Sequence, residues 1–469
     1  MAGRHKGKTT MLKHLLGPEI EELIKGKNYN NLKEAISVWE PSEITDLLLS
    51  LPGEDQPILF RLLRRQKAAD VFASLHAEQQ QQLLKNLTNE HIRTLLDELD
   101  PDDRTKLFEE FPAQITQQLM TLLSPEDLRE ARKLLGYPED SIGRLMTPDF
   151  VAIQPEWEIS RALDHIRKHG RDAETINVIY VVDNNGKLID DLRLRTLILA
   201  SPGKTVESVM DYHFVSLSAY DDQEIAARAM QNYDRIALPV TDSEGVLLGI
   251  VTVDDILDVI EEEATEDMHK IGGLEAIDTP YLTTPFSVLV KKRARWLVVL
   301  FLGEMLTAAA MGHFEKEIAR AVVLALFVPL IISSGGNSGS QAATLIIRAM
   351  AVGEITLRDW WRVMRREILS GLSLGAILGS IGFLRIAIWQ KLFYLYGVHW
   401  LLVAATVALA LVGVVMWGTL SGSMLPFILK RAGADPAASS APFVATLVDV
   451  TGLMIYFTVA GFILSGTLL

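Results

Sequence analysis

Cysteine is absent from all 469 residues, which excludes disulfide bonds, thiolate metal sites and cysteine nucleophiles. The ten histidines are scattered, and the sequence shows no nucleophile–base set and no histidine cluster of the kind that binds metals. The basic residues 1–16 lack the apolar core of a secretory signal, so we expect the first half to stay in the cytoplasm. These absences argue against an enzyme and fit a reducing compartment.

Acidic residues are concentrated in the first part of the chain. Residues 1–290 carry 51 Asp and Glu against 30 Lys and Arg, whereas residues 291–469 carry 8 against 15. The second part holds five long apolar runs and the first holds none. A chain of this length is not expected to form one core. We therefore predict a multidomain protein with an acidic soluble half followed by a membrane domain.

An apolar residue recurs at every twelfth position within residues 17–141. The series is Leu51, Leu63, Leu75, Leu87, Leu99, Phe111 and Leu123. One helix with its turn is too small to bury its own apolar face, so stacked neighbours are expected to supply the core. We predict an all-α helical solenoid for this N domain, with a chance register in a leucine-rich stretch as the alternative.

Residues 142–262 contain the same pattern twice, with short β-branched runs alternating with helical stretches. The copies are predicted at 142–204 and 205–262, and they open around Met146 and Met210. The second copy closes with Gly249-Ile250-Val251-Thr252-Val253-Asp254-Asp255. This duplicated β-α-β-β-α unit resembles a tandem pair of CBS domains, which have an α/β fold.

A connecting segment leads to five apolar runs of bilayer length. Residues 263–291 are predicted to form a helix that is acidic at its start and has its basic end at the lipid headgroups. The membrane domain, residues 292–469, is predicted to be all-α, with spans at 296–312, 321–345, 369–388, 400–425 and 444–468. Gly371, Gly375 and Gly379 form a smooth face on the third span, where another helix is expected to pack.

Basic residues gather on one side of the predicted spans. They precede the first span and separate the second from the third and the fourth from the fifth: Lys291, Lys292, Arg293, Arg295, Arg348, Arg358, Arg362, Arg365, Arg366, Lys430 and Arg431. Because basic loops stay in the cytoplasm, we predict a multi-pass protein of the plasma (inner) membrane, with a cytoplasmic N-terminus and an external C-terminus.

Two acids fall inside the predicted spans, Glu304 in the first and Asp449 in the fifth. A charged group within a bilayer is costly unless it faces water or a partner, so each is a functional candidate. A hydrogen bond to a neighbouring helix, or a protonated carboxyl, is the structural alternative for both. For Glu304 the two interpretations are balanced, whereas for Asp449 we favour function.

The second span carries small polar residues from Ser333 to Thr344, which suit a pore lining better than a lipid face. Mg²⁺ dehydrates reluctantly, so a conducting site needs few direct ligands, such as one carboxylate per chain with carbonyl and hydroxyl oxygens. We predict a pore site formed by Asp449, Ala445, Gly336, Asn337, Ser340 and Thr344.

Three motifs carry a resemblance that covers nearly the whole chain. They are Gly335-Gly336-Asn337-Ser338-Gly339-Ser340-Gln341-Ala342-Ala343-Thr344, Asp435-Pro436-Ala437 and Pro442-Phe443-Val444-Ala445-Thr446-Leu447-Val448-Asp449-Val450-Thr451-Gly452. The chain is identified as a member of the MgtE family of Mg²⁺ channels, whose domain order also matches. The resemblance implies a homodimer in a lipid bilayer that takes up Mg²⁺ through a pore with an aspartate at Asp449. It implies no nucleic-acid partner.

The resemblance also implies that Mg²⁺ closes the channel by screening acids between the cytoplasmic domains. The matching positions are Asp222, Glu224, Asp234, Asp254, Asp255, Asp258, Glu263, Glu266 and Asp267, with Asp102 or Asp103 and Asp435 completing such sites. Like charges brought together repel, so cations must neutralise them. A solvated acidic surface is the alternative interpretation of any single residue.

The sequence departs from the family at two pore positions and leaves several alternatives open. Many members have Asn where Ser340 and Ala441 stand, so a broader preference that includes Mn²⁺ or Co²⁺ is an alternative to Mg²⁺ selectivity. Thr252 and Asp255 match a nucleotide-binding pattern of CBS domains, so ATP binding and a purely structural use of the fold both remain. The remaining transport classes are an ion-coupled transporter with Glu304 as proton carrier, and an anion channel, which the embedded acids disfavour.

Overall fold

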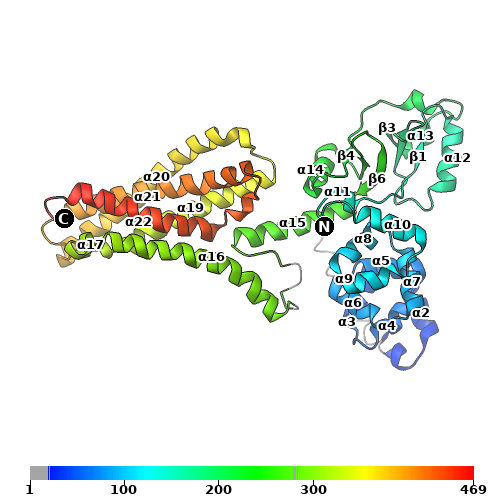
Figure 1. The fold of residues 1–469 in the computed structure, drawn as a ribbon, viewed down its shortest axis with the longest axis horizontal. Helices are drawn as coiled ribbons and strands as arrows, with labels where there is room; N and C mark the ends of the chain where they lie inside the picture. Colours follow the sequence, from blue (N-terminus) through cyan, green and yellow to red (C-terminus); the bar gives the residue numbers. More distant parts are fainter. Residues whose placement is uncertain (1–18, 21, 278–280, 283, 469) are drawn as a thin grey trace. The chain divides into compact units, whose positions relative to one another are not determined.

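The computed structural model describes residues 19–468 except 21, 278–280 and 283 (Figure 1). The chain divides into two compact units, Met1–Glu261, called unit 1, and Glu262–Leu469, called unit 2. The basic tail predicted at residues 1–16 lies outside the described residues.

Unit 1 begins with a stack of short helices. They are α2 (Tyr29–Ser37), α3 (Pro41–Ser50), α4 (Gln56–Arg61), α5 (Arg65–Ala73), α6 (Ala77–Leu84), α7 (Asn89–Glu98), α8 (Pro101–Glu110), α9 (Ala113–Met120) and α10 (Pro125–Leu134). From α5 to α10 each helix begins twelve residues after the previous one, which confirms the predicted period. Pro101 and Pro125 occupy first turns, where the N–H that proline lacks has no helical partner.

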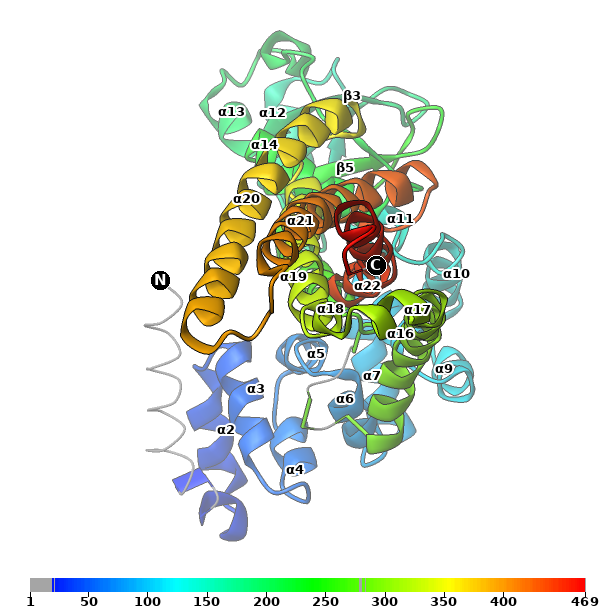
Figure 2. The same cartoon turned by 90° about the vertical axis from the view of Figure 1, so that its left-hand side faces the viewer.

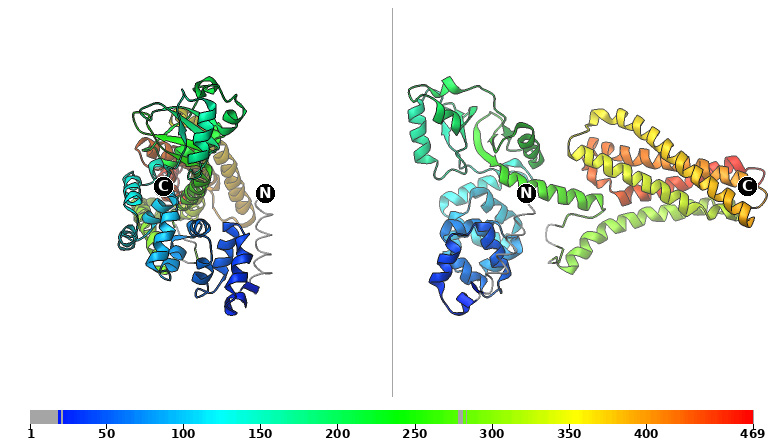
Figure 3. Two further views of the ribbon diagram at one scale, coloured as in Figure 1. Left: turned by 90° about the vertical axis from the view of Figure 1, so that its right-hand side faces the viewer. Right: turned by 180° about the vertical axis from the view of Figure 1, so that it is seen from behind.

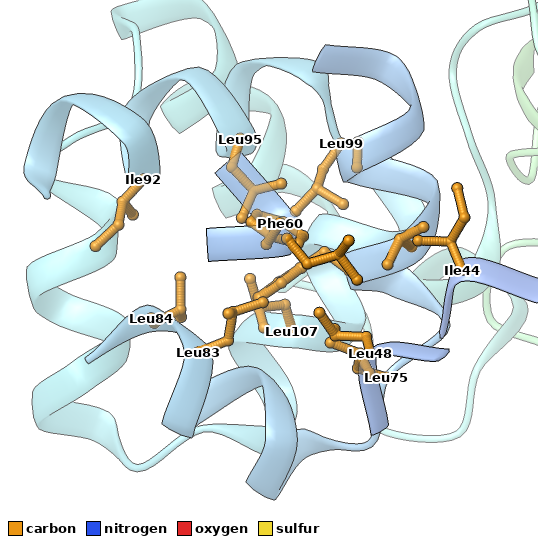
Figure 4. Packing of buried hydrophobic residues seen from close by; sticks show 14 of the residues in the cluster. Ile44, Leu48, Phe60, Leu75, Leu83, Leu84, Ile92, Leu95, Leu99 and Leu107 are labelled. Carbon is orange, nitrogen blue, oxygen red and sulfur yellow. The ribbon is translucent and has the colours of Figure 1, made fainter. Parts of the chain in front are cut away.

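The periodic apolar residues close the core of this stack. Leu75 and Leu99 are buried among leucines that converge from successive helices, around the ring of Phe60 (Figure 4). Leu51, Phe111 and Leu123 are buried in the same cluster, whereas Leu63 and Leu87 are only partly buried against it. No helix of this length could bury so much apolar surface alone, so the stack folds through contacts between repeats.

Two three-stranded sheets follow, one in each predicted copy. The first copy contains α11 (Ile142–Leu145), β1 (Ala152–Ile153), α12 (Ile159–His169), β2 (Val178–Val182), β3 (Leu188–Arg193) and α13 (Leu194–Leu199). The second contains η1 (Val206–Val209), β4 (Leu217–Ser218), α14 (Gln223–Tyr233), β5 (Ala237–Thr241) and β6 (Leu247–Thr252). In both, the first strand runs parallel to the second, and the second runs antiparallel to the third. The duplication is therefore confirmed.

The connecting helix differs from the prediction of one helix over residues 263–291. Helix α15 begins earlier, directly after β6, and spans Val253–Ile271. It ends because Gly272 and Gly273 follow: Gly273 has a φ of +71°, and the N–H of Leu274 donates to the carbonyl of His269. This is a glycine-dependent helix end that a side chain would strain. The last residues of the predicted segment instead begin the first membrane helix.

The described residues of unit 2 contain five helices long and apolar enough to span a membrane, as predicted. Its elements are α16 (Phe286–His313), α17 (Glu315–Arg320), α18 (Val322–Ala325), α19 (Val328–Ala351), η2 (Leu357–Asp359), α20 (Trp360–Phe393), α21 (Trp400–Arg431), η3 (Pro436–Ala438) and α22 (Ala441–Leu464). The long helices run alongside one another (Figure 3). The second predicted span is divided into α18 and α19, because Pro329 opens a new helix at its first turn.

Helix α21 is the centre of the membrane helices. It packs against α19, α20 and α22, whereas α16 lies at the side of α22 (Figure 2). The glycine face of α20 meets α21 as predicted, and a Cβ placed on Gly375 would lie 2.7 Å from the Cα of Val412. On the other side of α21, a Cβ on Gly339 would lie 2.8 Å from the carbonyl oxygen of Gly418. These helices therefore meet backbone to backbone.

Gly375→Ala should destabilise the membrane helices, because the added methyl group would overlap the backbone of α21. Gly461→Ala on α22 is the matched control, since nothing lies within 4 Å of its Cβ position. We expect the first variant to lower the thermal unfolding temperature in detergent by about 5 °C and the control to leave it unchanged or raised. Equal effects would show that the α20–α21 contact tolerates a side chain.

Candidate ion site and acidic cluster

One side of α19 is polar and is not covered by the described part of the chain. Ser333, Asn337, Gln341 and Thr344 are exposed, although the helix is long and apolar enough to cross a membrane. Residues three and four positions apart share a helix face, so these side chains form one stripe. The opposite face, which includes Gly335 and the residues that pack on α21 and α22, is buried. A polar stripe at membrane depth needs water or another protein surface.

Asp449 lies beside this stripe because α22 approaches α19 at a glycine. A Cβ placed on Gly336 would lie 3.5 Å from the Cβ of Ala445 and 4.0 Å from Oδ1 of Asp449. One turn away, the Ser340 hydroxyl donates a hydrogen bond of 3.0 Å to the carbonyl oxygen of Ala441. The structure therefore brings together Asp449, Ala445, Gly336 and Ser340 of the predicted pore site.

The two other predicted pore residues make local contacts on α19. The Thr344 hydroxyl donates to the carbonyl oxygen of Ser340 at 2.9 Å, and the Asn337 side-chain amide lies 3.5 Å from the Ser333 hydroxyl. Both side chains are exposed and belong to the polar stripe of α19. Their oxygen atoms remain available to a hydrated cation on the open side.

A separate acidic cluster forms in unit 1, between α8 and the start of α15. Asp102 and Asp103 at the first turn of α8 lie near Asp255 on α15, and Glu174, in the loop after α12, acts on Asp102 as well. One carboxylate oxygen of Asp102, Oδ1, is buried and has no hydrogen-bond partner within the described part of the chain. Four carboxyl groups from three segments therefore interact electrostatically, and one of them has a buried oxygen without a hydrogen-bond partner in the described residues.

Burial and mutual repulsion raise the pKa values of this cluster. Burial, followed by the charges of Asp255 and Asp100, raises the pKa of Asp103 to about 7. Burial, followed by Asp100 and Asp255, raises the pKa of Glu174 to about 7. The pKa of Asp102 is raised well above its ordinary value by burial and then by Asp255 and Asp103. Such groups hold protons near neutral pH unless a cation takes their place.

Several other predicted acids have partners within the chain. The Asp222 carboxylate caps α14 by accepting the N–H of Glu224 at 2.9 Å, and Glu224 forms an ion pair with Arg228. Asp234 ends α14 in the left-handed region, with a φ of +49°. Among the described residues, no three His, Asp or Glu side chains are placed to hold one metal ion. The predicted regulatory acids thus do not assemble a complete coordination sphere within one chain.

Glu266 and Asp435, two further predicted acids, face the same lysine. Lys270 Nζ lies 2.6 Å from a carboxylate oxygen of each, so its charge links the end of α15 to the segment before α22. Burial alone would lower the pKa of Lys270, but its hydrogen bonds with Asp435 and Glu266 outweigh burial and raise the pKa above the usual range. We call this arrangement the Lys270 bridge.

The predicted nucleotide residues are in contact with each other. The Thr252 hydroxyl donates to Oδ2 of Asp255 at 2.6 Å, at the junction of β6 and α15. In the first copy, Asp190 instead accepts backbone N–H groups of Asp211 and Tyr212, and Asp191 pairs with Arg235 at 2.8 Å. The segment that closes the second copy therefore pairs a threonine with an aspartate, whereas the corresponding segment of the first copy binds backbone N–H groups and an arginine.

The sequence interpretation missed four groups. Glu174 and Asp100 join the acidic cluster, and a loop acid such as Glu174 has no local pattern that predicts its place. Lys270 stands four residues after Glu266, a spacing that favours an ion pair on a helix. Arg385 on α20 lies over the ring of Trp389, 5.6 Å from its centre, and the (i, i+4) spacing was a usable signal.

Comparison with known proteins decides the family. A magnesium transporter MgtE of Thermus thermophilus is 40% identical over 96% of this chain and 98% of its own length. The chain belongs to the MgtE family. A second member, from Enterococcus faecalis, is 33% identical over 71% of this chain and 72% of its own length. The chain is thus a multi-pass membrane protein of a family whose named members are magnesium transporters.

Family models and solved structures agree with this assignment. Residues 328–459 match a divalent cation transporter model, 39–140 an MgtE intracellular N domain, and 142–203 and 206–262 CBS domains. The cytosolic domain of an MgtE Mg²⁺ channel, crystallised with ATP, is 38% identical with a TM-score of 0.50, over 52% of this chain and all of that one. The soluble part of a magnesium transporter is 30% identical with a TM-score of 0.50, over 53% and 98%. The fold class predicted from the sequence is confirmed.

Asp103→Asn should stabilise the protein at pH 8 in the absence of Mg²⁺. The folded-state pKa of Asp103 lies near 7, above an unfolded value of about 4. Its contribution to folding is therefore most favourable at low pH and is lost as the pH rises from about 4 to about 7. We expect the variant to unfold about 3 °C higher at pH 8, with the difference shrinking toward pH 4.5.

The control for this measurement is Asp46→Asn, at an exposed position on α3. Excess Mg²⁺ should reduce the gain from Asp103→Asn, because the ion neutralises the same charge. A gain that is equal at pH 4.5 and pH 8 would contradict the raised pKa.

Lys270→Met should loosen the end of α15, because two facing carboxylates would lose the cation between them. We expect backbone hydrogen exchange over residues 262–274 to become about tenfold faster, with exchange in α21 unchanged. Lys391→Met at the far end of α20, an exposed position, is the control. Exchange at the wild-type rate in Lys270→Met would mean that apolar packing of Ile271 alone holds this segment.

Proposed function

We propose that this protein is a homodimeric Mg²⁺ channel of the plasma (inner) membrane, and that intracellular Mg²⁺ gates it. The pore site is formed by Asp449, Gly336, Ala445 and Ser340, with Asn337 and Thr344 along the same path. The N-terminus is cytoplasmic and the C-terminus external, in agreement with the basic ends of the predicted spans.

The observation that supports a pore is the uncovered polar stripe of α19 with Asp449 beside it. A single chain that left this surface in lipid would expose hydroxyl, amide and carboxyl groups at a high cost. A second copy facing it across a water-filled path would satisfy these groups and would place two aspartates on one axis. Hydrated Mg²⁺ suits such a site, because carbonyl and hydroxyl groups bind its water shell while the carboxylates balance its charge.

The acidic cluster and the Lys270 bridge support gating through α15. Asp255 and Asp258 lie near the start of this helix, and Glu266 and Lys270 lie in its last two turns. Mg²⁺ bound among the acids lowers their repulsion and favours the arrangement in which they are close. Because one helix carries both sets of contacts, a change in the first is transmitted to the second. Glu263 and Asp267 lie on the same helix and join the regulatory surface.

A nucleotide is a second ligand of the cytoplasmic unit in this proposal. A related cytosolic domain was crystallised with ATP. In this chain Thr252, the last residue of β6, is hydrogen-bonded to Asp255 in the first turn of α15, and this pair would bind a ribose hydroxyl. Binding would raise the thermal unfolding temperature of the purified protein. An unfolding temperature that ATP does not change would remove the nucleotide from the proposal without affecting transport.

Asp449→Ala should abolish Mg²⁺ uptake into liposomes that carry the purified protein and a lumenal Mg²⁺ dye. The variant loses the only carboxylate of the proposed site, so the charge of the hydrated cation would have no compensating charge there. Glu315→Ala, at an exposed position on α17, should conduct like wild type. If Asp449→Ala conducts equally while folded and dimeric, the site lies elsewhere. If wild type does not conduct, the channel assignment itself fails.

A further inference from the structure

Glu304 of α16 lies next to the proposed pore site. Its carboxyl group is within hydrogen-bonding reach of the Asp449 carboxyl group, although the two residues belong to the first and fifth membrane helices. The side chain of Glu304 is otherwise exposed, and that of Asp449 is half-buried. The two acids that the sequence places within membrane spans therefore meet in the structure.

The meeting is determined by close packing of the two helices. A Cβ placed on Gly303 would lie 2.8 Å from Cγ2 of Thr446, so α16 approaches α22 closely at this level. Glu304 follows Gly303, and Asp449 lies one turn after Thr446. The contact between α16 and α22 thus aligns the acids, and a side chain at position 303 would separate the helices.

Among the described residues, no basic side chain forms an ion pair with Glu304 or Asp449. The Lys and Arg residues of α16 lie at 291–295, nine or more positions before Glu304, and His313 lies nine positions after it, which is about 13 Å along a helix in each direction. On the neighbouring helices, Arg348 of α19 pairs with Glu354, and Lys430 and Arg431 stand at the end of α21. No ion pair involves Glu304 or Asp449 in the described part of the chain. The hydroxyl oxygen of Thr307, one turn beyond Glu304, is also buried without a hydrogen-bond partner there.

We propose that Glu304 is a specificity-determining residue of the ion pathway, which together with Asp449 selects divalent over monovalent cations. The inference rests on the proposed function and adds a second carboxylate per chain to its site. A divalent cation compensates two carboxylates at once, whereas a monovalent cation leaves one uncompensated. In a homodimer the path would carry four such groups, so the hydrated divalent ion is held through its water shell at two levels.

Glu304→Gln separates this role from a structural one, because glutamine keeps the shape and hydrogen-bonding capacity and removes the charge. We measure Mg²⁺ uptake at increasing external Mg²⁺ and Na⁺ flux in the same liposomes. We expect the half-saturating Mg²⁺ concentration to rise about tenfold and the Mg²⁺ to Na⁺ flux ratio to fall by a similar factor, with a smaller change in maximal rate. Glu304→Asp should retain most of the selectivity, and Glu315→Gln should behave like wild type.

The outcomes distinguish the inference from the function on which it rests. If Asp449→Ala is inactive but Glu304→Gln keeps wild-type half-saturation and flux ratio, the pore site stands and the role of Glu304 is rejected. If Glu304→Ala lowers the unfolding temperature while Glu304→Gln conducts and selects normally, Glu304 is a packing residue and the inference is again rejected. If Asp449→Ala conducts like wild type, the proposed site fails, and the inference fails with it.

Discussion

The backbone contact between α19 and α21 is the constraint on which the membrane domain depends. Gly339 and Gly418 leave no room for a side chain, so the buried face of α19 is fixed against its neighbour. The polar residues of α19 lie on the face opposite to this contact, so they point away from α21. The same packing lets α22 approach Gly336 and bring Asp449 to the edge of the polar stripe. Small residues at one interface therefore determine where the polar chemistry lies.

The carboxyl groups at the start of α15 repel one another, whereas those at its end are paired with a lysine. At its start, carboxyl groups gather without enough cations, and their raised pKa values record the cost of that arrangement. At its end, Lys270 supplies the missing charge between Glu266 and Asp435. The repulsion among the acids at the start of α15 is relieved only by protons or cations from solution. Glu266 and Asp435, by contrast, are already paired with Lys270. Under the proposed gating by Mg²⁺, sensitivity to the ion would lie at the start of α15 rather than at the Lys270 bridge.

The sequence predicted most of the architecture because the architecture is periodic. A twelve-residue repeat, a duplicated strand and helix pattern and five apolar runs are local signals, and each appears in the structure. The glycine face of α20 was predictable for the same reason. What the sequence could not supply were the contacts between distant segments: Glu174 beside Asp102, and Glu304 beside Asp449. These contacts depend on how distant elements pack against one another, and no pattern within a single segment predicts that packing.

The connecting helix ends earlier than the sequence predicted, and the turn after it separates it from the first membrane helix. Charge patterning suggested one continuous helix, but two glycines stop α15 at Ile271, and Trp296 of α16 packs where a Cβ on Gly273 would lie. A continuous helix would transmit a push along its axis directly to the first span. A turn does not, because the helical hydrogen-bond ladder is interrupted at Gly272 and Gly273, so α15 and the first span are separate rigid elements.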